Sequence, residues 1–181
     1  MKVFGLVGWS DSGKTTLMTR LIPELISRGL RVSTAKHAHH EFDLDTRGKD
    51  SYLHRESGAT EVMIASKQRW ALLHEHRNEP EPNLDELMAH MTPVDLLIVE
   101  GMKQHPHDKI EVHRAGRAAP LILEEQPDVV AVAADVPLEG LSVPVLDLND
   151  PGAIAEFIIE HCGLAPLAEA GRRAASQSGG S

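Results

Sequence analysis

The chain has 181 residues, which corresponds to about one domain, and its hydrophobic fraction of 41% excludes intrinsic disorder for most of its length. Its net charge of −9 disfavours nonspecific binding to polyanions, and an aromatic fraction of 3% is too low for a surface that stacks nucleic-acid bases. A single cysteine, Cys162, excludes an intramolecular disulfide and a cysteine-rich metal site.

The first third of the chain predicts a strand, a glycine-rich turn and a helix. The apolar run Val3–Val7 is typical of a buried strand, and it ends at Gly8. Apolar residues then recur at helical spacing from Lys14 to a stop at Gly29, with a bend expected at Pro23.

The rest of the chain alternates between strands and helices. Asp50 is expected to cap a helix that ends at Gly58, and Asn83 with Glu86 predicts a capping box. We expect strands over 31–36, 61–65, 70–73, 95–99, 109–113, 129–134 and 144–148, and helices over 51–57, 84–91 and 151–162. This alternation predicts the α/β class, with a mostly parallel twisted sheet and helices on both faces.

The turn after the first strand carries a phosphate-binding motif. Gly8–Thr15 satisfies G-x-x-x-x-G-K-(S/T), in which glycines let backbone N–H groups converge on a phosphate. The lysine of the motif reaches the β- and γ-phosphates, and its hydroxyl residue holds Mg²⁺. We therefore expect a nucleoside triphosphate to contact Gly8, Trp9, Ser10, Asp11, Ser12, Gly13, Lys14, Thr15 and Thr16.

An acidic residue that follows a buried strand is expected to complete the metal site. The run Asp95–Val99 is apolar after its first residue and is followed by Glu100, at the carboxyl end where ligands bind in open α/β sheets. We expect Lys14 and Glu100 to be the catalytic residues, and Thr15, Asp43 and Glu100 to hold Mg²⁺. The fold is thus predicted to be a P-loop NTPase domain over residues 1–165, with a flexible tail over 166–181.

The polar stretch from His37 to Arg55 is a second candidate region. It follows the strand after the phosphate loop, so Asp43 or Asp45 could hold Mg²⁺ or orient a water. His39 and His40 could bind a metal or an anion, and Lys49 with Arg55 could form an anion-binding surface. A solvated polar loop is the alternative. The same two possibilities, a metal site or a solvated loop, apply to His105 and His107. No carboxylate or cysteine accompanies them at the fixed spacing of a zinc site.

Several strings resemble the MobB family of molybdopterin-guanine dinucleotide biosynthesis adapter proteins over roughly residues 1–163. The most specific are K-H-x-H-H at 36–40 and K-I-E-V-H-R at 109–114, together with the phosphate loop and Val99–Gly101. The resemblance implies a homodimeric protein that binds GTP with Mg²⁺ and has weak GTPase activity. It also implies cooperation with a MobA-like guanylyltransferase, and contact with molybdopterin remains open.

The sequence motifs alone do not determine which nucleobase the protein binds or which reaction it catalyses. No N-K-x-D motif reads guanine, and Asp135 is the only acid placed after a strand where it could accept from the base. A small-molecule kinase or ATP-dependent ligase is an alternative, with Asp43 as its base, and a nickel-type metallochaperone is another. No apolar run reaches the roughly 20 residues of a membrane span, so we expect a cytoplasmic protein without membrane or nucleic-acid partners.

Overall fold

The computed structural model describes residues 1–38, 42–116 and 120–170. These residues form two compact units. The first comprises Met1–His37 together with the chain from Thr92 onward, and the second comprises Ala38–Met91.

The first unit is built on a six-stranded sheet in which every strand pair is parallel. The order across the sheet is β2-β5-β1-β6-β7-β8, so the chain crosses over β1 when it passes from β5 to β6. The strands are β1 (Lys2–Val7), β2 (Val32–Lys36), β5 (Leu96–Glu100), β6 (Lys109–His113), β7 (Val129–Ala134) and β8 (Val145–Asp147). Because all of them run the same way, the segments that follow β1, β5, β6 and β7 lie at one edge of the sheet.

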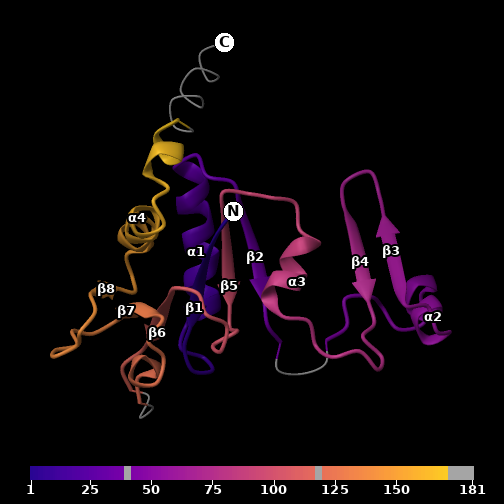
Figure 1. Ribbon diagram of the computed structural model, residues 1–181, viewed down its shortest axis with the longest axis horizontal. Helices are drawn as coiled ribbons and strands as arrows, with labels where there is room; N and C mark the ends of the chain where they lie inside the picture. Colours follow the sequence, from indigo (N-terminus) through magenta and orange to yellow (C-terminus); the bar gives the residue numbers. More distant parts are fainter. Residues whose placement is uncertain (39–41, 117–119, 171–181) are drawn as a thin grey trace. The chain divides into compact units, whose positions relative to one another are not determined.

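Two helices cover one face of this sheet. Figure 1 shows α1 (Lys14–Ser27) and α4 (Pro151–His161) next to each other, and their apolar residues share a core with alternate residues of the strands. Leu21 and Ile154 belong to this core and are fully buried. On the opposite face, the short 3₁₀ helix η1 (Ile122–Glu124) packs with Val7. The predicted α/β fold class is confirmed.

The second unit contains a β-hairpin and two short helices. The strands β3 (Glu61–Ala65) and β4 (Trp70–His74) pair antiparallel, with Glu61 opposite His74 and Ala65 opposite Trp70. The helix α2 (Asp50–Glu56) precedes them and α3 (Leu84–Ala89) follows. The predicted capping box of α3 is confirmed, since Asn83 accepts from the Glu86 N–H at 3.1 Å and Glu86 accepts from the Asn83 N–H at 2.8 Å.

The structure differs from the sequence-based prediction in two local features. Asp50 does not cap α2, because the helix begins one residue earlier and Asp50 is its first residue. At the other end of the chain, residues 165–170 are helical and Ala168 packs in the core, so the folded part extends past the boundary predicted at Pro166. Among the described residues, no helix combines the length and apolar character that crossing a membrane requires.

Candidate nucleotide-binding site

The phosphate loop lies between β1 and α1, at the point where the strand order reverses. At Gly8, φ is 152°, and a Cβ there would lie 2.6 Å from the carbonyl oxygen of Val112 on β6. Gly13 is the N-cap of α1 in the left-handed conformation, with φ at 99° and no side-chain cap. The glycines therefore fix the shape of the loop and leave the first N–H groups of the helix for a ligand, which is the geometry of a phosphate site.

Lys14 holds its ammonium group over the same loop. Its Nζ donates to the carbonyl oxygens of Gly8 and Trp9, each at 2.8 Å. Burial lowers the pKa of Lys14, and the nearby Glu100 carboxylate acts in the opposite direction. A partly desolvated cation of this kind makes strong charge-assisted hydrogen bonds to phosphate oxygens.

Thr15 and Glu100 lie together, as the sequence predicts for a metal site. The Thr15 hydroxyl Oγ1 donates to Oε1 of Glu100 at 3.4 Å, and Lys36 Nζ lies 3.6 Å from the same oxygen. The Glu100 side chain is mostly buried, with 12% exposure. A hydroxyl and a carboxylate at the end of a phosphate loop are the hard oxygen donors that Mg²⁺ takes beside nucleotide phosphates, so the residues present fit this ion.

Trp9 and Ser12 of the loop differ in solvent exposure and in hydrogen bonding. Trp9 is 41% exposed, and its indole Nε1 donates to the Pro120 carbonyl at 2.8 Å while Lys103 Nζ lies 4.5 Å from the ring centroid. Ser12 is buried, and its Oγ has no hydrogen-bond partner among the described residues. Ser10, Asp11 and Thr16 are exposed. A buried, unpaired hydroxyl beside Gly8 is a polar group that a bound phosphate could satisfy.

Arg114 is a residue of this site whose role was not predicted from the sequence. It follows β6 directly, and a Cβ built on Gly13 would lie 2.7 Å from its Nε. The Nε is buried and has no hydrogen-bond partner among the residues described. The sequence signal was present, because Arg114 comes directly after a strand of the sheet, at the edge where ligands bind.

Asp135 follows β7 at the same edge of the sheet. It is exposed, and its Oδ1 accepts a hydrogen bond from the Ala115 N–H at 2.8 Å. This contact ties the carboxylate to the segment after Arg114 and leaves Oδ2 outside that bond. The position agrees with the predicted site edge, and a role in reading the base stays a prediction.

The predicted loop residues Asp43, Asp45 and Arg55 belong to the second unit, where they contact one another. Arg55 Nη2 donates to Asp43 at 2.7 Å and to Asp45 at 3.0 Å, and Nη1 donates to Glu75 at 3.3 Å. Three carboxylates therefore surround this guanidinium, and it is not the available cation that the anion-binding hypothesis needs. The metal role of Asp43 stays a prediction, and His39 and His40 lie outside the described residues.

Two charged residues of the K-I-E-V-H-R string are buried and hold neighbouring loops. Lys109 is fully buried, and its Nζ donates to the carbonyls of Lys103 at 3.1 Å and His105 at 2.9 Å. Glu111 is also fully buried and accepts from the N–H groups of Ile122 and Leu123, both at 2.9 Å. The string thus fixes the loop after β5 and the start of η1 around the strand that presents Arg114.

His105 and His107 form a pair within the first unit. Their Nδ1 atoms are 3.0 Å apart, and His107 is buried against Gly5. Burial lowers the pKa of His107 to about 4, and the charge of Lys109 acts in the same direction. His107 is therefore a neutral core residue at physiological pH.

Comparisons with known proteins identify the relatives of this chain. The family model "Molybdopterin guanine dinucleotide synthesis protein B" matches residues 3–135. A molybdopterin-guanine dinucleotide biosynthesis adapter protein of Escherichia coli is 43% identical over 163 residues, with 87% of this chain and 91% of that protein covered. The Haemophilus influenzae protein of the same name is 45% identical over 159 residues, with 86% of each chain covered.

Solved structures of similar proteins have the same fold. A crystal structure of molybdopterin-guanine biosynthesis protein B superposes with a TM-score of 0.70 at 31% identity, and the match covers 87% of this chain and 98% of that chain. A MobB homologue from Bacillus stearothermophilus superposes with a TM-score of 0.65 at 28% identity, covering 91% and 99%. The fold described above is therefore shared with these proteins.

Proposed function

Because the chain belongs to the molybdopterin guanine dinucleotide synthesis protein B family of adapter proteins, we propose that it binds GTP with Mg²⁺ and assists the attachment of GMP to molybdopterin. The observation that carries the nucleotide site is the approach of the Thr15 hydroxyl to Glu100 at 3.4 Å beside the uncapped start of α1. Lys14 neutralises the phosphates, and Thr15 and Glu100 hold the metal, directly or through its waters.

The choice of guanine is assigned to Asp135. A carboxylate accepts hydrogen bonds from N1 and N2 of guanine, and adenine offers no such pair of donors at these positions. Asp135 lies at the sheet edge that carries the phosphate loop, and one of its oxygens is already held by Ala115. The base and the phosphates would then be read by segments that follow different strands of one sheet.

The test is a calorimetric titration of the full chain with GTP and, separately, with ATP, each in the presence of Mg²⁺. We expect GTP to bind at least about 10-fold more tightly, and Asp135→Asn to lose most of this preference because an amide presents a donor to the base edge. Asp147→Asn is the matched control, since Asp147 is the last residue of the neighbouring strand β8. Equal affinities for GTP and ATP in the parent chain would contradict the proposal.

Hydrolysis by the chain alone is expected to be slow. Rapid P-loop hydrolases position the attacking water with a glutamine or receive an arginine from a partner, and the proposed site uses neither. The expected turnover is about 10⁻⁴ to 10⁻² s⁻¹, measured as phosphate release under saturating GTP. Turnover of several per second without a partner would contradict an adapter role.

The adapter role also implies partners. We propose a homodimer in the cytoplasm that acts with a MobA-like guanylyltransferase. The word adapter in the names of the similar proteins supports the part of this proposal that concerns a partner in the biosynthesis. The kinase or ligase alternative is not favoured, because the family match covers the phosphate loop, Glu100 and Asp135. In addition, Asp43, which would be the general base of a kinase, accepts a hydrogen bond from Arg55.

A further inference from the structure

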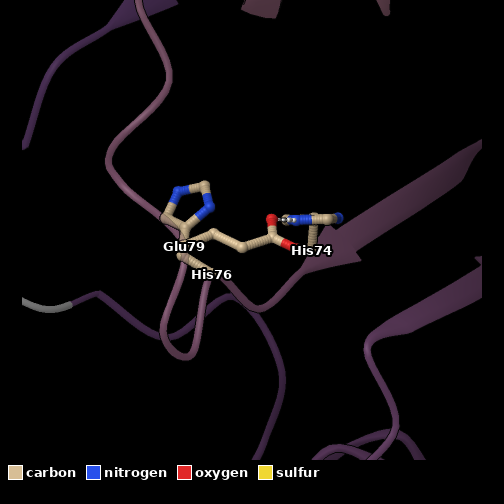
Figure 2. A group of neighbouring side chains, drawn as sticks. All are labelled: His74, His76 and Glu79. Atoms are coloured by element: carbon tan, nitrogen blue, oxygen red, sulfur yellow. Dashed lines mark hydrogen bonds and ion pairs between the residues drawn. The ribbon is translucent and has the colours of Figure 1, made fainter.

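The second unit carries a cluster of metal-ligating side chains that the nucleotide site does not use. His74, His76 and Glu79 each offer one ligand atom, and these three atoms lie within 4.8 Å of one another. Figure 2 shows the Glu79 carboxylate directed at the His74 ring, with the His76 ring carried by the adjoining turn. We propose that these residues bind one divalent transition-metal ion of the Zn²⁺ class.

The local backbone brings the three residues together for a definable reason. His74 ends β4, and a turn then reverses the chain so that the Glu79 N–H donates to the His76 carbonyl at 2.7 Å. Within this turn Arg77 has a positive φ of 50°, and its guanidinium donates to the carbonyls of Arg55 at 3.1 Å and Ala59 at 2.9 Å. The turn is thus held by contacts outside the cluster, which places Glu79 beside the end of the strand before any ion binds.

His74 is also oriented as metal-bound histidines are. Its cross-strand partner Glu61 lies 2.9 Å from its Nδ1, so this nitrogen is the one that donates. The other ring nitrogen, Nε2, lies 3.4 Å from Glu79 Oε2, so the two atoms that would share the ion already face each other. A histidine that donates one ring N–H to a carboxylate and presents the other nitrogen to the ion is the usual arrangement in metal sites.

The distances fit a small tetrahedral ion. Zinc binds nitrogen and oxygen at about 2.0 to 2.2 Å, so neighbouring ligand atoms in a tetrahedral site are about 3.3 to 3.5 Å apart. His74 Nε2 and Glu79 Oε2 are 3.4 Å apart. The His76 ring lies 5.4 Å from the His74 ring between centroids, and both histidines are exposed, so a rotation of His76 can complete the third contact.

Three protein ligands leave a fourth coordination position. The cluster borders a cavity of about 570 Å³ within the second unit, which Trp70, Leu72 and His90 also line. Zinc sites with three protein ligands keep such a position for water or an exchangeable ligand. Imidazole and carboxylate donors together favour Zn²⁺, Ni²⁺ or Co²⁺ over Mg²⁺, which prefers oxygen ligands alone.

The experiment titrates the full chain with Zn²⁺ and, in parallel, follows the visible absorption of Co²⁺ as a report on coordination geometry. We expect a single tight ion per chain, with affinity reduced at least about 10-fold in His76→Ala and in Glu79→Gln. Glu61→Gln should weaken binding by about 10- to 100-fold without removing a ligand, because it loses the carboxylate that orients His74. The Co²⁺ spectrum should report four- or five-coordination.

Matched controls separate this site from other histidines and from the nucleotide site. His54→Ala and His105→Ala remove exposed and half-buried histidines outside the cluster, and both should bind Zn²⁺ like the parent chain. Lys14→Ala should also retain Zn²⁺ binding, whatever its effect on GTP. Unchanged Zn²⁺ affinity in His76→Ala and Glu79→Gln, or a loss confined to His54→Ala or His105→Ala, would overturn the proposal.

Discussion

Replacement of Lys14 by alanine is expected to weaken triphosphate binding strongly while the fold stays intact. The ammonium lies over the carbonyls of Gly8 and Trp9, where it meets the β- and γ-phosphates of a nucleotide in the loop. Loss of a charge-assisted contact of this kind costs about 1.5 to 3 kcal/mol or more, which is a decrease in affinity of about 10- to 150-fold. Calorimetric titration with Mg²⁺·GTP measures the change.

Lys36→Ala is the matched control for this experiment. Lys36 also approaches the Glu100 carboxylate, but its side chain is 63% exposed and it lies outside the phosphate loop. We expect its effect on GTP affinity to be about 1 kcal/mol or less, as for an exposed ion pair. Thermal unfolding should be nearly unchanged in Lys14→Ala, because the glycines and the backbone shape the loop. Parent-like GTP affinity in Lys14→Ala would show that the phosphate-loop assignment is wrong.

The parts of the site that are continuous in sequence could be predicted well. The phosphate loop, its strand and its helix form one uninterrupted segment, so their residue types and spacing predict both the local structure and the ligand. The structure confirms the strand, the turn and the helix. The Thr15–Glu100 contact also followed from the sequence. It needs only the rule that parallel strands place their carboxyl ends at one edge, and β1 and β5 are neighbours in the sheet.

The parts that depend on long-range pairing were not predictable in the same way. Nothing in the local pattern around Arg55 indicates that Asp43, Asp45 and Glu75 converge on it, because Glu75 is 20 residues away on the far side of a hairpin. The cluster of His74, His76 and Glu79 is local in sequence, but its geometry depends on a turn in which Arg77 has a positive φ, and the residue pattern did not indicate that turn. A single sequence shows the charges but not which of them are neutralised.

The strand β6 buries two charged residues that the alternation of polar and apolar residues would place in solvent. Alternation along a strand places Lys109 and Glu111 on the face opposite Ile110 and Val112, and a polar face is ordinarily solvated. Both charged residues are instead fully buried, each with backbone partners from a loop that packs over the strand. The charges therefore act as structural anchors, and this explains a conspicuous string without giving each of its residues a role in binding.

Glu111→Ala is expected to be the most destabilising substitution at this face. The carboxylate accepts from the N–H groups of Ile122 and Leu123, and its removal leaves two backbone donors without this partner at the start of η1. Each buried donor left unsatisfied costs about 1 to 3 kcal/mol, so the free energy of unfolding should fall by about 2 to 6 kcal/mol. Urea unfolding monitored by circular dichroism measures this difference.

Glu125→Ala makes the same chemical change at an exposed position that ends the same 3₁₀ helix, and should stay within about 0.5 kcal/mol of the parent. If Glu111→Ala unfolded within about 1 kcal/mol of the parent, water would be replacing the carboxylate, and Glu111 would not anchor the loop.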